Sequence, residues 1–189
     1  LNGTMKKMLP DVMMIAEESS AWKNITSFEG DGLGFDLKWN MGWMNDTLAY
    51  AKQDPIFRKH FHEKVTFPMM YAFNENYVLA YSHDEVVHGK CSMVNKMSGL
   101  YNDKFANLRA LFGYQFAHPG KKLNFMGSEI AQFIEFDEKR QIDWFLLDYP
   151  KHAEMQRYMR EVHRIYKSRP ALYENEVNWE GFKWLNVND

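Results

Sequence analysis

Residues 77–90 read YVLAYSHDEVVHGK, an apolar run that ends abruptly on three ionisable residues, His83, Asp84 and Glu85. The part from Val78 to Tyr81 is too short for a helix and is rich in β-branched and aromatic residues, which is typical of a strand buried on both faces of a parallel sheet. The ionisable residues then lie at the carboxyl end of that strand, where α/β barrels and open α/β sheets bind their ligands. A solvated turn after an ordinary strand is the alternative interpretation.

The composition places the chain among globular proteins. Its 189 residues are 46% hydrophobic and 16% aromatic, which is enough to bury a core. The net charge is -2 and both signs are interspersed, so neither a nucleic acid nor an anionic membrane is expected as a partner. No apolar run approaches the ~20 residues that span a bilayer. The single Cys91 can form no internal disulfide, which favours a reducing compartment, and we expect a cytoplasmic protein.

The pattern of apolar residues predicts alternating strands and helices. Together with the run described above, apolar runs predict strands near 12–16, 35–40 and 123–126. Helical spacing predicts helices over 41–53, 102–118 and 150–168. This alternation indicates a parallel sheet with its functional edge on one side. Four such units are half of a closed (β/α)₈ barrel, so the chain forms either an open α/β sheet or half of a barrel.

Two carboxylates, Glu17 and Asp84, each follow a predicted strand, and a glycosidase requires such carboxylates at its site. Glu18 is adjacent to Glu17, but successive strand residues point to opposite faces, so only one of them can be the acid in a regular strand. Burial beside other carboxylates would raise the pKa of that acid, as general acid catalysis near neutral pH needs. Trp43 is predicted to lie in the core. For Trp22, a place in the core and stacking on a sugar ring are equally compatible with the sequence.

A metal site is the main alternative for the histidine-rich stretches. His83 and His88 superficially match a zinc-protease motif, but they are five residues apart, roughly 140° around a helix at ~100° per residue. Two such side chains would not converge on one ion. His60, His62 and Glu63 are interpreted as a solvated face because no further ligand is obvious nearby.

Seven stretches between residues 14 and 127 carry a specific pattern: Met14–Ser19, Gly32–Phe35, Lys38–Leu48, Leu79–Lys90, Lys104–Arg109, Pro119–Leu123 and Phe125–Gly127. In these motifs the sequence resembles the bacterial 1,4-α-glucan branching enzymes of the α-amylase superfamily. The Glu-Glu-Ser that follows Ala16, and the stretch Ser-His-Asp-Glu-Val-Val-His-Gly-Lys, are closer to branching enzymes than to plain amylases.

The resemblance implies a (β/α)₈ barrel. Residues 1–170 would form its C-terminal half, about strands five to eight with their helices. Residues 171–189 would lead into a C-terminal β domain, and strand-like alternation over 176–187 agrees with that assignment. The N-terminal half of the barrel and an upstream β domain would then be absent from the chain.

The same resemblance implies a role for each site residue. Glu17 matches the general acid/base after the fifth strand, and Asp84 matches the carboxylate after the seventh strand that stabilises the transition state. His83, Glu18 and Trp22 would contact the substrate, an α-glucan such as glycogen. The implied reaction cleaves an α-1,4 bond through a covalent glucosyl-enzyme intermediate and transfers the chain to a 6-hydroxyl. It calls for no metal or organic cofactor.

One departure from the family limits these expectations. The nucleophilic Asp of the family lies in an Arg-Val-Asp motif, and no such motif occurs here, because Asp143 follows Arg140-Gln141-Ile142. The chain also begins on Leu1 rather than Met, which suggests a piece of a longer protein. We therefore predict that the chain alone is inactive, and that unpaired strand edges make it self-associate. An amylase-type hydrolase and a glucan-binding module without catalysis are the alternatives.

Overall fold

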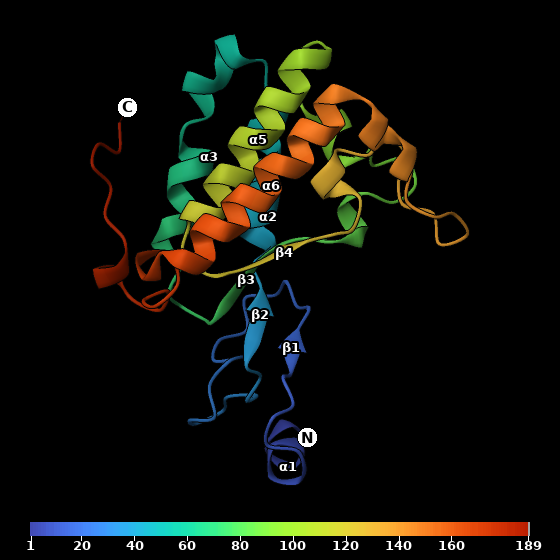
Figure 1. Cartoon of the computed structure of the whole chain (residues 1–189). Coiled ribbons are helices and arrows are strands. Elements are labelled where there is room, and N and C mark those ends of the chain that lie inside the picture. The colour runs from blue at the N-terminus through green and yellow to red at the C-terminus, as the bar shows by residue number, and fades with distance from the viewer. Residues whose placement is uncertain (189) are drawn as a thin grey trace.

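The protein is built around a four-stranded parallel sheet. The computed structural model describes residues 1–188. The strands are β1 (Ile15–Ala16), β2 (Leu37–Trp39), β3 (Tyr77–Tyr81) and β4 (Lys121–Asn124). Their order is β1-β2-β3-β4, and each is parallel to the next (Figure 1). The predicted α/β fold with a parallel sheet is confirmed. The last strand begins two residues earlier than predicted, at Lys121, and Lys122 within it is buried with its Nζ 3.7 Å from Glu176 Oε1.

Helices connect β2 to β3 and β3 to β4 and cover one face of the sheet, whereas a loop without a helix joins β1 to β2. The α-helices are α1 (Asn2–Met8), α2 (Met41–Lys52), α3 (Glu63–Thr66), α4 (Met93–Lys96), α5 (Tyr101–Ala117) and α6 (Pro150–Ser168). Short 3₁₀ helices are η1 (Pro55–Phe61), η2 (Phe67–Met70), η3 (His83–Glu85), η4 (Ser128–Ile130), η5 (Trp144–Asp148), η6 (Pro170–Leu172) and η7 (Trp179–Gly181). None of the helices within 1–188 is both long and apolar enough to cross a bilayer.

The three long helices occupy the predicted ranges because their ends carry local signals. The side chain of Asn40 accepts a hydrogen bond of 2.9 Å from the amide of Trp43 and so caps the start of α2. Helix α6 begins with Pro150 in its first turn, where a missing N–H costs nothing, and it ends before Pro170. Figure 1 shows α5 and α6 side by side over the sheet.

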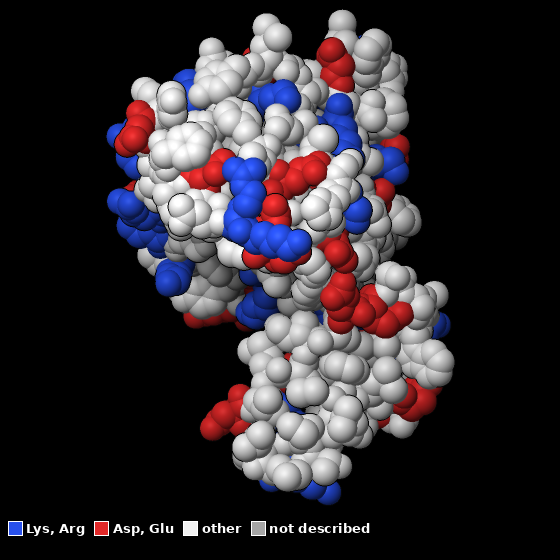
Figure 2. Space-filling model, turned by 90° about the vertical axis from the view of Figure 1, so that its right-hand side faces the viewer, with Lys and Arg blue, Asp and Glu red and all other residues white. Residues whose placement is uncertain are grey.

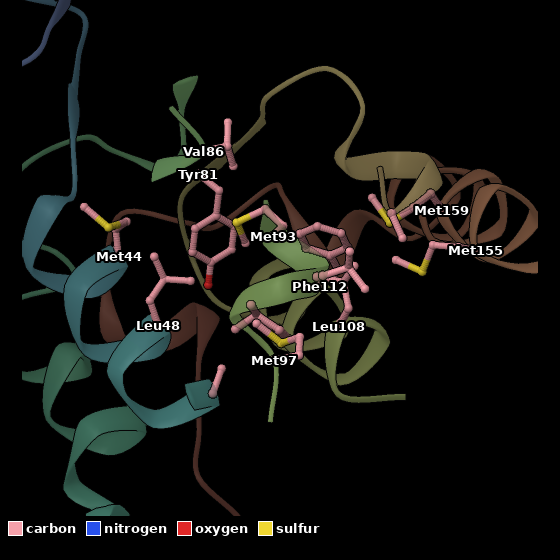
Figure 3. Packing of buried hydrophobic residues seen from close by; sticks show 14 of the residues in the cluster. Met44, Leu48, Tyr81, Val86, Met93, Met97, Leu108, Phe112, Met155 and Met159 are labelled. Carbon is pink, nitrogen blue, oxygen red and sulfur yellow. The ribbon is translucent and has the colours of Figure 1, made fainter. Parts of the chain in front are cut away.

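The core lies between the sheet and these helices. Leu79 and Tyr81 of β3 contribute to it, and Figure 3 shows Tyr81 pointing toward Met44 and Leu48 of α2. Trp43 is fully buried, with its ring centroid 5.1 Å from that of Tyr81, which confirms its predicted place in the core. Each fully buried side chain of this size stabilises the fold by roughly 1.5–3 kcal/mol. This packing fixes β3, and therefore the turn that follows it.

The N-terminal part of the chain projects away from the helices. In Figure 1, α1, β1 and the following loop lie below the helical layer, and Figure 2 shows this part as a smaller lobe beneath the main body. Several of its apolar side chains are exposed, including Met13, Ile15 and Phe28. Strand β1 forms one end of the sheet and β4 the other. Both outer edges of the sheet are therefore unpaired within the described part of the chain.

The C-terminal segment differs from its prediction. Within 171–188 the structure contains η7 and irregular backbone but no strand, so the strand expected over 176–187 is wrong. Aromatic packing explains the alternating pattern, because the ring of Trp179 lies 5.1 Å from that of Phe73. Glu176 also holds the segment by an ion pair of 2.5 Å with Lys121. The β domain assigned to 171–189 stays a prediction, and its last residue lies outside the described part.

Candidate functional site

A buried carboxylate shapes the turn after β3. Glu85 is 7% exposed, and its Oε2 accepts hydrogen bonds of 2.7 Å from both the backbone amide and the hydroxyl of Ser82. The Ser82 hydroxyl in turn accepts from the amide of Asp84 at 3.2 Å. This reciprocal arrangement is a capping box, and it fixes the backbone of η3. Sequence reasoning missed the role of Glu85, although the Ser-x-x-Glu spacing is a known signal for it.

The capped turn presents His83 and Asp84 together. His83 Nε2 lies 3.3 Å from Asp84 Oδ1, and the two side chains are 44% and 45% exposed. The imidazole ring also lies 5.9 Å from the ring of Phe125, which follows β4. A carboxylate and an imidazole at the carboxyl end of a buried strand can accept and donate hydrogen bonds to the hydroxyls of a bound sugar.

Glu17 and Glu18 follow β1 directly, and their surroundings differ. Glu18 Oε2 lies 2.7 Å from Nζ of the buried Lys38, and its other oxygen accepts from the amide of Ser20. These two contacts lower the pKa of Glu18 to about 2, and the contact with Lys38 has the larger effect. An ionised carboxylate of this kind has no proton to donate. Glu17 is exposed, so the burial predicted for a general acid is not found.

Glu17 and Asp84 differ in their position along the strand direction of the sheet. Ala16, the last residue of β1, pairs with Lys38, and Lys38 pairs with Tyr77, the first residue of β3. Glu17 is thus one residue beyond the position of Tyr77 along the strand direction, whereas Asp84 comes three residues after Tyr81, the end of β3. A cavity of about 1110 Å³ lies beside Asp84, and Glu17 is not among its lining residues. Glu17 therefore does not share the cavity beside Asp84.

Trp22 lies on a loop that a distant carboxylate holds in place. Glu75 accepts hydrogen bonds from the amides of Ile25 and Thr26, at 2.9 and 2.8 Å, and from the Thr26 hydroxyl at 2.5 Å. Trp22 itself is 58% exposed, so its ring is not part of the core and is available for stacking. Nothing in the sequence pattern indicated Glu75, because its partners lie about 50 positions earlier in the chain.

No metal-binding cluster is found in the part of the chain that the structure describes. Within 1–188, no group of three or more His, Cys, Asp or Glu side chains could hold an ion. His60 lies in η1, and His62 contacts the backbone of the C-terminal segment, with its Nε2 2.5 Å from the Val187 oxygen.

The chain is similar to part of several much longer proteins. No family model matches the chain. The 1,4-alpha-glucan branching enzyme GlgB of Aquifex aeolicus is 54% identical over 190 residues, which cover 100% of this chain and 30% of that enzyme. The enzyme of the same name from Halothermothrix orenii is 52% identical, with the same coverage. The chain thus spans about 30% of the length of these curated relatives.

Solved structures show the same fold at low sequence identity. A Nostoc punctiforme debranching enzyme, soaked with acarbose, matches with a TM-score of 0.61 and 17% identity over 90% of this chain and 36% of that one. A protein from Thermus thermophilus matches with a TM-score of 0.58 and 16% identity over 89% of this chain and 37% of that one. Four parallel strands with their helices thus correspond to part of a larger α/β fold.

Proposed function

We propose that this chain, which is homologous over its whole length to part of the bacterial 1,4-α-glucan branching enzymes, forms the C-terminal half of a branching-enzyme barrel. Four sequential parallel strands with helices on one face support this proposal. A closed barrel needs eight strands, so a second set of four would cover the other face and pair with both outer edges. A cytoplasmic location belongs to the same proposal.

In this proposal the chain supplies two of the carboxylates of a retaining mechanism. Glu17 protonates the leaving oxygen and later takes a proton from the 6-hydroxyl of the acceptor chain, while Asp84 stabilises the oxocarbenium-like transition state. His83 binds a sugar hydroxyl beside Asp84, Glu18 lines the donor site, and Trp22 stacks on a sugar ring. The nucleophile comes from sequence outside this chain. The observation that carries the proposal is the capped turn at 82–85, which holds Asp84 at the carboxyl end of a buried strand.

This chemistry requires Glu17 and Asp84 to act on the same glycosidic bond, so both must face one cleft. The N-terminal lobe that carries Glu17 has little packing against the helices, and the missing half of a barrel would surround it (Figure 1). Pairing β1 with a further strand would fix its position at the edge of the sheet. We therefore expect the two carboxylates to converge only when the remaining strands are present.

A chimera tests this function directly. Residues 1–189 would replace the corresponding segment of the Aquifex aeolicus enzyme, which is 54% identical. We expect the chimera to form α-1,6 branches on amylose, measured by iodine absorbance and by debranching of the product. Glu17→Gln and Asp84→Asn should each abolish branching, whereas Glu29→Gln, at an exposed loop position, should not. A folded chimera that branches equally well with Glu17→Gln would overturn the assignment, and reducing ends without branches would indicate a hydrolase.

The chain by itself should not branch glucan and should self-associate. An acid and a stabilising carboxylate cannot form the covalent intermediate without a nucleophile. Unpaired edges at β1 and β4, together with exposed apolar side chains in the N-terminal lobe, favour association between copies. Branching by the purified chain would refute the first statement, and a monodisperse monomer in light scattering would refute the second.

A further inference from the structure

Three lysines line one cavity beside the turn after β3. The cavity has a volume of about 1110 Å³ and lies between α2 and the segment from η3 to α4. Lys52 reaches it from the end of α2, Lys90 from the loop, and Lys96 from α4. On the face that Figure 2 displays, the two signs of charge are mixed.

Lys96 is a buried charge without an acidic partner. It is 8% exposed, and its Nζ donates to the backbone oxygen of Lys90. Within residues 1–188, no carboxylate lies within 4.0 Å of that nitrogen. An ammonium group carries three donors, and burying it without a counter-charge is costly. Burial, and then the neighbouring charge of Lys52, lower the pKa of Lys96.

Two carboxylates, Glu85 and Glu135, lie close enough to Lys96 for their charges to interact with it, and both accept hydrogen bonds from other groups. Glu85 accepts both hydrogen bonds from Ser82, at 2.7 Å each. Glu135 accepts from the amides of Gly89 and Cys91, at 2.8 and 2.7 Å. Neither carboxylate forms an ion pair with Lys96. Asp84 and Glu85 line the cavity together with the three lysines, so one positive charge of the cavity remains for a ligand to neutralise.

We propose that this cavity binds a small anion that carries a phosphate group. Lys96 would provide the buried counter-charge, with Lys52 and Lys90 at the exposed rim. Lysine suits this role because its ammonium binds phosphate as a point charge and can adjust its direction on a flexible stem. Asp84 also lines the cavity, but it is 45% exposed and lies beside His83, so solvent screens its repulsion of an anion. The inference does not rest on the proposed branching activity, although the cavity is shared with Asp84.

Isothermal titration of the 189-residue chain with inorganic pyrophosphate and phosphate tests the proposal. We expect saturable one-site binding that weakens as sodium chloride is added. Lys96→Met and Lys52→Met should each weaken binding by about tenfold or more, because each removes a charged contact worth about one tenfold step. Lys139→Met, at an exposed lysine outside the cavity, is the matched control and should bind as the parent does.

The variants separate a real site from general attraction to positive charge. Lys52 is exposed, so Lys52→Met keeps the test valid even if the Lys96 variant folds poorly. Equal affinities for the parent, Lys52→Met and Lys139→Met would overturn the proposal, as would no saturable binding at millimolar phosphate and pyrophosphate. Preference for pyrophosphate over phosphate would identify a ligand with two phosphate groups, and the reverse would identify a monophosphate.

Discussion

Replacing Thr47 with valine should destabilise the chain more than replacing Tyr81 with phenylalanine, although both changes remove the same hydrogen bond. The two hydroxyl oxygens are 2.8 Å apart, and both residues are 1% exposed. The Thr47 hydroxyl also lies 2.8 Å from the backbone oxygen of Trp43. Its proton therefore has an acceptor there, and the Tyr81 hydroxyl donates to Thr47.

The unequal cost follows from what each substitution leaves behind. Thr47→Val leaves the Tyr81 hydroxyl buried without an acceptor, which costs about 1–3 kcal/mol. Tyr81→Phe removes the donor, but Thr47 keeps its bond to the Trp43 oxygen, so the cost is about 0.5–1.5 kcal/mol. Replacing both partners by apolar groups of the same shape is close to neutral. Adding Tyr81→Phe to Thr47→Val should therefore recover stability.

Urea unfolding at 25 °C, followed by tryptophan fluorescence and circular dichroism, measures the free energy of unfolding of the parent, both single variants and the double variant. The comparison holds when the dependence of that free energy on urea is the same for all four proteins. A double variant less stable than Thr47→Val, or a single Tyr81→Phe more costly than Thr47→Val, would show that the assigned donor and acceptor are wrong.

Three further changes test contacts near the sheet. Burial lowers the pKa of His118 to about 4, so the unfolded chain binds a proton that the folded chain does not, and stability should fall by about 3 kcal/mol between about pH 6.5 and pH 4. His118→Gln should flatten this slope in urea unfolding, and an unchanged slope would contradict the assignment. Glu85→Ala should cost about 1–3 kcal/mol and speed hydrogen exchange at the Ser82 amide, and normal protection there would argue against the capping box. Lys38→Met should raise the pKa of Glu18 from about 2 toward 4.5 in a carboxylate NMR titration, and no shift would exclude the ion pair.

The fold was predictable where local signals and burial agree. Helix α6 occupies its predicted range because Pro150 begins it and Arg169-Pro170 ends it. Strand β3 was predicted because its apolar residues are buried on both faces. The start of β4 was missed because Lys121 and Lys122 are not part of an apolar run, and the partner that buries Lys122, Glu176, lies 54 residues later. Strand-like alternation near Trp179 was misleading because aromatic packing produced it.

The candidate site was predictable only in its local parts. His83 and Asp84 are adjacent in sequence, so their proximity needed no fold. The distinction between Glu17 and Glu18 depends on Lys38, a residue on the neighbouring strand, and no sequence periodicity reveals that contact. The relative level of Glu17 and Asp84 depends on the register of three strands. Sequence patterns specify which residues end a strand, but the pairing of strands decides where those ends meet.

The short pairing between β1 and β2 has a consequence for local unfolding. Only two residue pairs join these strands, whereas four join β3 to β4 beneath the helices. Regions with few buried contacts open first in hydrogen exchange, and well-packed strands open last. Backbone amides near Glu17 should therefore exchange long before those near Asp84. The proposed acid and the proposed stabilising carboxylate thus belong to units of unequal local stability.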